Sequence, residues 1–300
     1  MEISTSEQNE KLQEIIRKVR KIEGLSRIIS SGSISGEYKS VFKSNGIEFD
    51  QVREYCDSDD SKMIDWNVTA RIGEPYVKTF VEERDLNIYF LVDISASGNF
   101  SSSESSKREI AAEIAAVIGI NALSRNDKIS LLLFSDQKEK YIRPGKGRKL
   151  LWKILRDILY FSPENKQTDI NEALSFFNKI RHTPGIVIII SDFLDQGFEQ
   201  LVRRTAIKNT VILIRIEDPI EKEFPKAGII EFTDAETGES CLIDTSDFQW
   251  RNQYSSLSRE KLMDLRSDTI DVLEISTEDT TEKVLRGYFH YKARRGRFYK

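Results

Sequence analysis

Residues 87–97 read NIYFLVDISAS and hold the pattern that decides the fold of this chain. The apolar run IYFLV is continuous, which is typical of a strand buried on both faces of a sheet. The run ends at Asp93, and Ser95 and Ser97 follow it at every second position. The stretch therefore predicts a strand of a mainly parallel sheet, with one carboxylate and two hydroxyls converging at its carboxyl end.

Apolar runs of the same kind recur after residue 86 and alternate with helical patterns. We predict strands at residues 87–92, 128–134, 185–190, 210–216 and 269–274, with a polar hairpin around residues 237–239. We predict helices at residues 106–123, 147–159, 169–181, 196–207, 247–266 and 278–290. This alternation indicates βα units, so residues 85–300 are expected to form one α/β domain, a mainly parallel sheet flanked by helices.

The first 84 residues lack this alternation and are assigned as an amino-terminal helix plus an irregular, partly β annex. An apolar stripe at helical spacing predicts an amphipathic helix formed around Leu12, Ile15, Ile16, Val19 and Ile22. Residues 73–75, Gly-Glu-Pro, are interpreted as a hairpin connection, and Trp66 is expected to anchor the annex to the main core. Charges of both signs in the annex are expected to form ion pairs, with Arg53 and Asp59 among them.

Composition excludes several classes of protein. Hydrophobic residues make up 39% of the 300 residues, which argues against fibrous and disordered chains. Forty-five basic against forty-nine acidic side chains give a net charge of -4, so no global field favours nucleic acid. The two cysteines lie far apart, and no apolar run reaches the length of a membrane span. We therefore expect a cytoplasmic protein without a membrane span.

Polar side chains follow two further predicted elements. Asp192 comes directly after the run GIVIII, and Thr168 precedes the helix that begins near residue 170. Ligands of open parallel sheets bind outside the carboxyl ends of the strands, where the strand order reverses. The five candidates supply oxygen only, as Mg2+ prefers: Asp93, Ser95, Ser97, Thr168 and Asp192. Each segment alone is more often a turn or a helix cap, and only their joint occurrence predicts a metal site.

The order Asp93-x-Ser95-x-Ser97, Thr168, Asp192 resembles the metal-ion-dependent adhesion site of von Willebrand factor type A domains. A second set of motifs resembles domain of unknown function family 58: Gly46-Ile47-Glu48-Phe49, Arg53-Glu54-Tyr55, Asp59-Asp60, Ile64-Asp65-Trp66, Thr69-Ala70-Arg71 and Glu82-Glu83-Arg84. This resemblance implies a von Willebrand A-like (Rossmann-like) α/β domain, often encoded beside a MoxR-type AAA+ ATPase. It also implies that the three hydroxyls contact Mg2+ (or Mn2+ or Ca2+), that both aspartates hold coordinating waters, and that a partner supplies an acidic sixth ligand.

We therefore expect a divalent-cation-dependent protein-interaction protein rather than an enzyme. Its expected partner supplies an Asp or Glu and is a MoxR-type AAA+ ATPase or a client of one. A metal-dependent hydrolase using the same cluster is the alternative, although no histidine or lysine is expected beside it as a general base. His182 and His290 are interpreted as ordinary surface residues. A nucleic-acid-binding module through the basic residues 292–300 is a third, less favoured alternative because the whole chain is acidic.

Overall fold

The computed structural model describes residue 17 and residues 46–56, 59–61, 64–83, 85–99, 102, 105–165, 167–222, 228–233, 240–244 and 262–295. Apart from Arg17, the helix predicted near the amino terminus lies outside these residues, as does most of the helix predicted over 247–266. The chain divides into two compact units, residues 42–86 and the remainder, residues 1–41 and 87–300.

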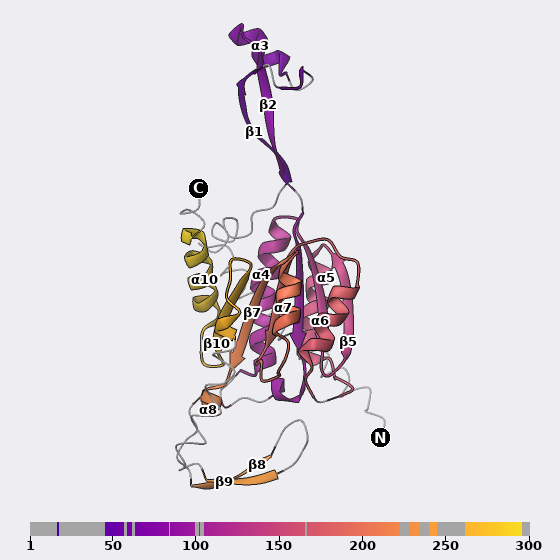
Figure 1. The fold of residues 1–300 in the computed structure, drawn as a ribbon, viewed down its shortest axis with the longest axis vertical. Helices are drawn as coiled ribbons and strands as arrows, with labels where there is room; N and C mark the ends of the chain where they lie inside the picture. Colours follow the sequence, from indigo (N-terminus) through magenta and orange to yellow (C-terminus); the bar gives the residue numbers. More distant parts are fainter. Residues whose placement is uncertain are drawn as a thin grey trace. The chain divides into compact units, whose positions relative to one another are not determined.

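The larger unit is built on a six-stranded sheet (Figure 1). Its strands run in the spatial order β10 (Ile270–Ser276), β7 (Thr210–Glu217), β6 (Ile186–Ser191), β3 (Asn87–Asp93), β4 (Lys128–Phe134) and β5 (Lys138–Gly145). Neighbours are parallel except β4 and β5, which are antiparallel. The predicted mainly parallel sheet is confirmed. The edge strand β5 was not predicted, because its sequence KEKYIRPG has one fully buried position and no apolar run.

Helices cover both faces of this sheet. They are α4 (Lys107–Ser124), α5 (Arg148–Tyr160), α6 (Ile170–Lys179), α7 (Glu199–Ala206), the short α8 (Pro219–Lys222) and α10 (Thr281–Arg295). Helix α4 contacts α5 and α10, whereas α6 contacts α7 (Figure 1). Ser106 and Glu109 form the predicted capping box of α4, and Asp169 caps α6. The helices predicted at 106–123, 147–159, 169–181 and 196–207 are confirmed within a few residues at each end.

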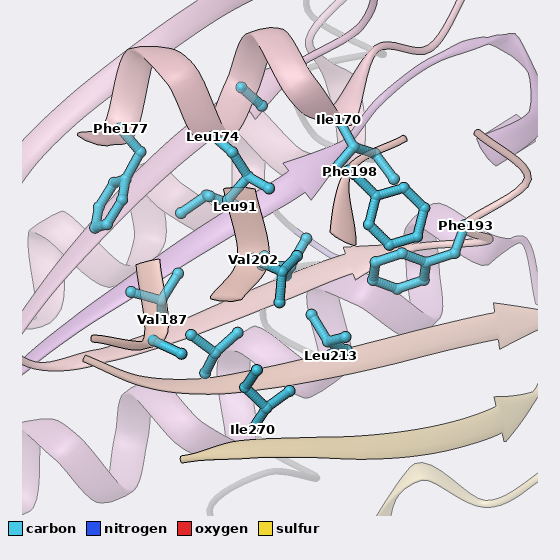
Figure 2. Close-up of a cluster of buried hydrophobic side chains, with 14 of the residues drawn as sticks. Leu91, Ile170, Leu174, Phe177, Val187, Phe193, Phe198, Val202, Leu213 and Ile270 are labelled. Atoms are coloured by element: carbon cyan, nitrogen blue, oxygen red, sulfur yellow. The ribbon is translucent and has the colours of Figure 1, made fainter. Parts of the chain in front are cut away.

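The core fills both sides of the sheet because the central strands are apolar at most positions on both faces. Residues 88–92 of β3 are each at most 1% exposed. Figure 2 shows one of the two layers, in which Leu174 and Phe177 of α6 and Val202 of α7 pack against Leu91 and Leu213. In the other layer α4 lies so close to α5 that a Cβ on Gly119 would meet Leu151 Cδ1 at 2.6 Å. Small residues on α4 therefore allow the tight packing of these two helices.

The strand order reverses between β3 and β6. From β3 the chain proceeds outward to β4 and β5, and then returns to β6 on the other side of β3. Connections that leave neighbouring strands in opposite directions open a crevice at their carboxyl ends. Asp93 ends β3 and Asp192 directly follows β6, so the fold brings both predicted carboxylates to this crevice.

The smaller unit is an antiparallel hairpin of β1 (Gly46–Glu54) and β2 (Tyr76–Glu83) with the short helix α3 (Trp66–Ile72) between them. Asp65 caps α3, and Gly73 ends it with φ 91°. The hairpin connection predicted at residues 73–75 is therefore wrong, because Gly73 adopts the left-handed conformation that terminates a helix. Trp66 is 69% exposed, and its predicted role as an anchor to the main core stays a prediction.

Two further predictions are confirmed by local structure. Arg53 and Asp59 form an ion pair at 2.6 Å within the smaller unit. In the larger unit β8 (Ile229–Thr233) pairs antiparallel with β9 (Ser240–Asp244), on either side of the predicted turn at residues 237–239. The turn itself lies outside the described residues.

Candidate metal centre

Asp93 is held in place by two hydrogen bonds, one from the loop that follows it and one from the end of the neighbouring strand β6. Its Oδ1 accepts a hydrogen bond from the Ser95 backbone N–H at 2.9 Å, and its Oδ2 accepts one from Ser191 Oγ at 2.7 Å. After Asp93 the chain enters a 3-10 turn at residues 96–99, which brings Ser95 Oγ within 3.1 Å of Ser97 Oγ. One carboxylate and two hydroxyls therefore converge beyond the end of β3, as predicted.

Asp192 lies across from this group, at the end of the neighbouring strand. It is 6% exposed, and the preceding residue, Ser191, binds both Asp93 and the backbone N–H of Phe193. A cavity of about 20 Å³ lies between the two strand ends and is lined in part by Asp93, Ser97 and Asp192. This volume is enough for about one water molecule or one ion.

Thr168 is brought to the same edge of the sheet through its loop. The next residue, Asp169, donates its backbone N–H to Ser135 O at 2.9 Å, just beyond β4. The backbone N–H of Ile170 donates to Asp195 Oδ2 at 2.8 Å, in the loop after β6. Because β3 lies between β4 and β6, the loop that carries Thr168 is held on both sides of the Asp93 strand end. The cavity is lined directly by Asp93, Ser97 and Asp192. Ser95 is not in the lining, but its Oγ lies within hydrogen-bond distance of Ser97 Oγ. Thr168 lies on the flanking loop.

The two aspartates repel one another. Desolvation of the half-buried carboxyl, followed by the negative charge of Asp192, raises the pKa of Asp93 to about 7, although hydrogen bonds from Ser95 and Ser191 act in the opposite direction. A bound cation would offset the negative charge of Asp192 that opposes the ionisation of Asp93.

The donor set fits a hard divalent cation. Adjacent ligands of an octahedral Mg2+ ion, each at about 2.1 Å, lie about 3 Å apart, close to the 3.1 Å between Ser95 Oγ and Ser97 Oγ. The cavity has the size of one ion and is lined by the carboxylates of Asp93 and Asp192. No three histidine, cysteine, aspartate or glutamate side chains of the described residues gather as a metal site. Any cation at this edge would depend on the serine and threonine hydroxyls.

Two basic residues that we did not predict also line the cavity. Lys107 is 4% exposed, and its Nζ lies 3.1 Å from Asp192 Oδ2 and 2.6 Å from Glu221 Oε1. Burial alone would lower the pKa of Lys107, but the charges of Asp192 and Glu221 outweigh burial and raise it. Burial lowers the pKa of Arg108, and the negative charge of Asp93 partly offsets this effect.

Sequence reasoning did not place a lysine beside the cluster, whereas Lys107 forms ion pairs with Asp192 and Glu221. A signal for Lys107 and Arg108 is present in the sequence, because both stand in the first turn of α4, where the helix dipole disfavours positive charge. Buried basic residues at that position require acidic partners nearby, and Asp192 and Glu221 meet that requirement for Lys107.

His182 is half-buried at the opposite end of the sheet, so the residue predicted to be an ordinary surface residue also packs against core side chains. Its ring lies 4.3 Å from that of Phe177 and 5.6 Å from that of Tyr89, and its Nδ1 lies 3.0 Å from Ile180 O. Helix α6, about 15 Å long, separates His182 from the loop that carries Thr168. His182 thus stabilises packing and does not reach the candidate metal centre.

The basic carboxyl segment is partly engaged within the fold. Lys292 of α10 forms an ion pair with Asp271 Oδ2 at 2.6 Å, and residues 296–300 lie outside the described part of the chain. Across the described ranges, no helix is both long enough and apolar enough to cross a membrane.

Several known proteins are similar to this chain in sequence or in structure. An uncharacterized protein of Mycobacterium tuberculosis (strain ATCC 25618 / H37Rv), Rv1480, is 28% identical over 210 residues, which are 69% of this chain and 66% of the relative. The chain thus matches just under two thirds of that relative's length. Among solved structures, the conserved hypothetical protein BatB from Bacteroides thetaiotaomicron is 16% identical with a TM-score of 0.44, covering 70% of this chain and 99% of BatB. The SpRpn10 VWA domain is 11% identical with a TM-score of 0.41, covering 68% of this chain and 95% of that domain.

The fold class and the family were both predicted correctly. The structure is a mixed α/β fold with a mostly parallel six-stranded sheet between helices, and von Willebrand A-like domains are among the structures it resembles. The family described as "Protein of unknown function DUF58" matches residues 51–263, which include most of the smaller unit and every residue of the candidate metal centre. The chain belongs to this family.

Proposed function

We propose that this protein docks an acidic group of a protein partner at the crevice between β3 and β6, in a manner that depends on a divalent cation. The observation that carries the proposal is the pairing of Asp93 and Asp192 beside two hydroxyls that are 3.1 Å apart. Mg2+ suits this oxygen set, and Mn2+ or Ca2+ are alternatives. When bound, the cation would supply the positive charge that attracts a partner carboxylate.

The residues of the centre would have two different roles in binding the cation. Ser95, Ser97 and Thr168 would offer neutral hydroxyl ligands, and Asp93 and Asp192 would hold coordinating waters. Neutral ligands leave positive charge uncompensated, so an incoming Asp or Glu remains attractive. Ser191 and the backbone N–H of Ser95 fix the orientation of Asp93. The site is built to hold a carboxylate oxygen in one place.

We propose binding rather than catalysis at this centre. Lys107 remains protonated beside Asp192 and Glu221, since its pKa is raised, and a protonated amine is a poor general base. His182 lies at the other end of α6. Asp93, with a pKa of about 7, is the cavity group suited to accepting a proton. Its two oxygens already accept hydrogen bonds from Ser95 and Ser191, which favours its use in holding a ligand.

The partner class is proposed from the family resemblance. A MoxR-type AAA+ ATPase, or a client that such an ATPase remodels in the cytoplasm, would present the acidic group. The acidic composition of the chain as a whole does not favour a nucleic-acid partner.

Direct measurement of cation binding tests the first half of the proposal. We expect Mn2+ to bind one site, measured by electron paramagnetic resonance, and Mg2+ to compete for it. A ligand that binds only the native state adds about 2.7 kcal/mol of stability at a hundredfold excess over Kd. Ser97→Ala should weaken binding at least tenfold, whereas Ser124→Ala, a hydroxyl deletion at the far end of α4, should leave it unchanged. Equal binding by both variants would contradict the proposed centre.

Docking is tested with a purified MoxR-type ATPase from the same source. EDTA and Ser97→Ala should each weaken the complex by similar factors, and the two changes should not add, because both remove one metal-bridged contact. A complex that is indifferent to EDTA, or losses that add in full, would refute cation-dependent docking.

A further inference from the structure

Lys107 places an ammonium group directly against one of the proposed metal-binding residues. Its Nζ lies 3.1 Å from Asp192 Oδ2, and the side chain lines the same cavity as Asp93 and Ser97. Both side chains of this pair are nearly buried, at 5% and 6% exposed. Little water screens the interaction, so Lys107 strongly affects any other charge that enters the cavity.

Lys107 and Arg108 balance the two aspartates of the cavity. Asp93 and Asp192 contribute two negative charges when ionised, and Lys107 and Arg108 contribute two positive ones. A site without these basic residues would attract a divalent cation with the full charge of both carboxylates. Here the positive charges weaken that attraction, and Lys107 occupies the Asp192 oxygen that faces it.

Glu221 offers Lys107 a second acceptor. The distance from Lys107 Nζ to Glu221 Oε1 is 2.6 Å, shorter than the distance to Asp192. Glu221 lies on α8, and its other oxygen accepts the backbone N–H of Asp218 at 3.0 Å. Glu221 is therefore held in position, and the ammonium can keep this contact when it loses Asp192.

We propose that Lys107 is a tethered cation that competes with the divalent ion for Asp192, and that Glu221 retains the ammonium when Asp192 is released. This inference rests on the proposed cation-dependent function and deepens it. The Lys107–Glu221 pair would set the affinity of the centre for metal, and it would link cation binding to α8, which follows β7 directly.

The test measures the Mn2+ dissociation constant of the full chain by electron paramagnetic resonance for a double-mutant cycle. Lys107→Met should bind Mn2+ at least tenfold more tightly than the wild type, because the competing charge is gone. Glu221→Gln should bind it severalfold more weakly, because Lys107 then depends on Asp192 alone. In the Lys107→Met background, Glu221→Gln should change the constant by less than about twofold, since no ammonium remains to be shared.

A matched control separates this effect from the loss of any positive charge. Lys153→Met removes an exposed lysine on α5 and should leave the Mn2+ constant unchanged. If wild type and variants all fail to bind Mn2+, the proposed function and this inference both fall. If the wild type binds but Lys107→Met binds no more tightly, only the inference falls. Should Lys107→Met not fold, as shown by circular dichroism, Glu221→Gln decides alone, and unchanged or tighter binding by it overturns the inference.

Discussion

The two units of this chain are stabilised in different ways. In the larger unit, consecutive residues 88–92 of β3 are each at most 1% exposed, and helices cover both faces of the sheet. In the smaller unit α3 buries none of its residues. Among its described side chains, Val77 and Asp65 are the buried ones. The larger unit therefore rests on apolar burial, whereas the interactions described in the smaller one are strand pairing, a helix cap and an ion pair.

This difference has an energetic consequence. Burial of apolar surface contributes about 25 cal/mol per Å², so each large core side chain of the sheet stabilises the fold by a few kcal/mol. An isolated two-stranded hairpin is marginally stable in water. The same substitution should therefore have different effects in the two units.

An aromatic-to-alanine pair should give the largest difference. Phe90 is 0% exposed and Trp66 is 69% exposed. Phe90→Ala should lower the free energy of unfolding by about 3–5 kcal/mol, because it leaves a cavity in a closely packed core. Trp66→Ala should change it by less than about 0.5 kcal/mol, as at most exposed sites. Urea unfolding followed by far-ultraviolet circular dichroism measures both, and similar losses would mean that Trp66 is covered in solution.

A glycine-to-alanine pair should give a smaller difference. A Cβ on Gly185, just before β6, would lie 2.2 Å from the backbone O of Asn87, so the two strands would have to separate. Gly185→Ala should cost about 2–3 kcal/mol through overpacking. Gly73 has open space around it but a φ of 91°, so Gly73→Ala should cost only about 1 kcal/mol of left-handed strain. Equal thermal shifts for the two variants would contradict this account.

The same contrast explains how much of the fold was predictable. Strands β3, β4, β6 and β7 were found because strands buried on both faces must be apolar throughout, and this pattern is local in the sequence. Strand β5 was missed because an edge strand exposes much of its surface to solvent. Helix α3 was read as part of a hairpin because it has no buried stripe, and only Asp65 and Gly73, its two caps, mark it.

The candidate site was predictable for a similar reason. Asp93, Ser95, Ser97 and Asp192 directly follow apolar strands, so the rule for open parallel sheets places them at one edge. The ion pairs of Lys107 could not be predicted in this way. They join residues 85 and 114 positions apart in the chain, and no local pattern in the sequence specifies such a pairing.

A pair of aspartates provides the smallest contrast. Asp218 is 0% exposed. Its Oδ2 accepts the backbone N–H of Ser102 at 2.8 Å and the Thr277 hydroxyl at 2.9 Å, and its Oδ1 accepts the backbone N–H of Ile220 at 3.1 Å and the Ser102 hydroxyl. Asp59 instead pairs with Arg53, whose side chain is 41% exposed. Desolvation would raise the pKa of Asp218, but its hydrogen bonds outweigh desolvation and lower it, whereas the Arg53 hydrogen bonds lower the pKa of Asp59.

Asp218→Asn should therefore cost about 2 kcal/mol at pH 7, because either orientation of the amide sets an NH2 group against a backbone N–H. A carboxyl whose pKa is lowered by folding stabilises the native state above its unfolded value, 3.8, and this contribution is lost as the pH falls through the folded value. The difference between wild type and variant should thus shrink between pH 5 and pH 3 in urea unfolding. Asp59→Asn should have a smaller effect that 0.5 M NaCl removes, since salt screens exposed charges. A difference at Asp218 that stays constant from pH 7 to pH 3 would show that the ionised carboxylate is not what these hydrogen bonds stabilise.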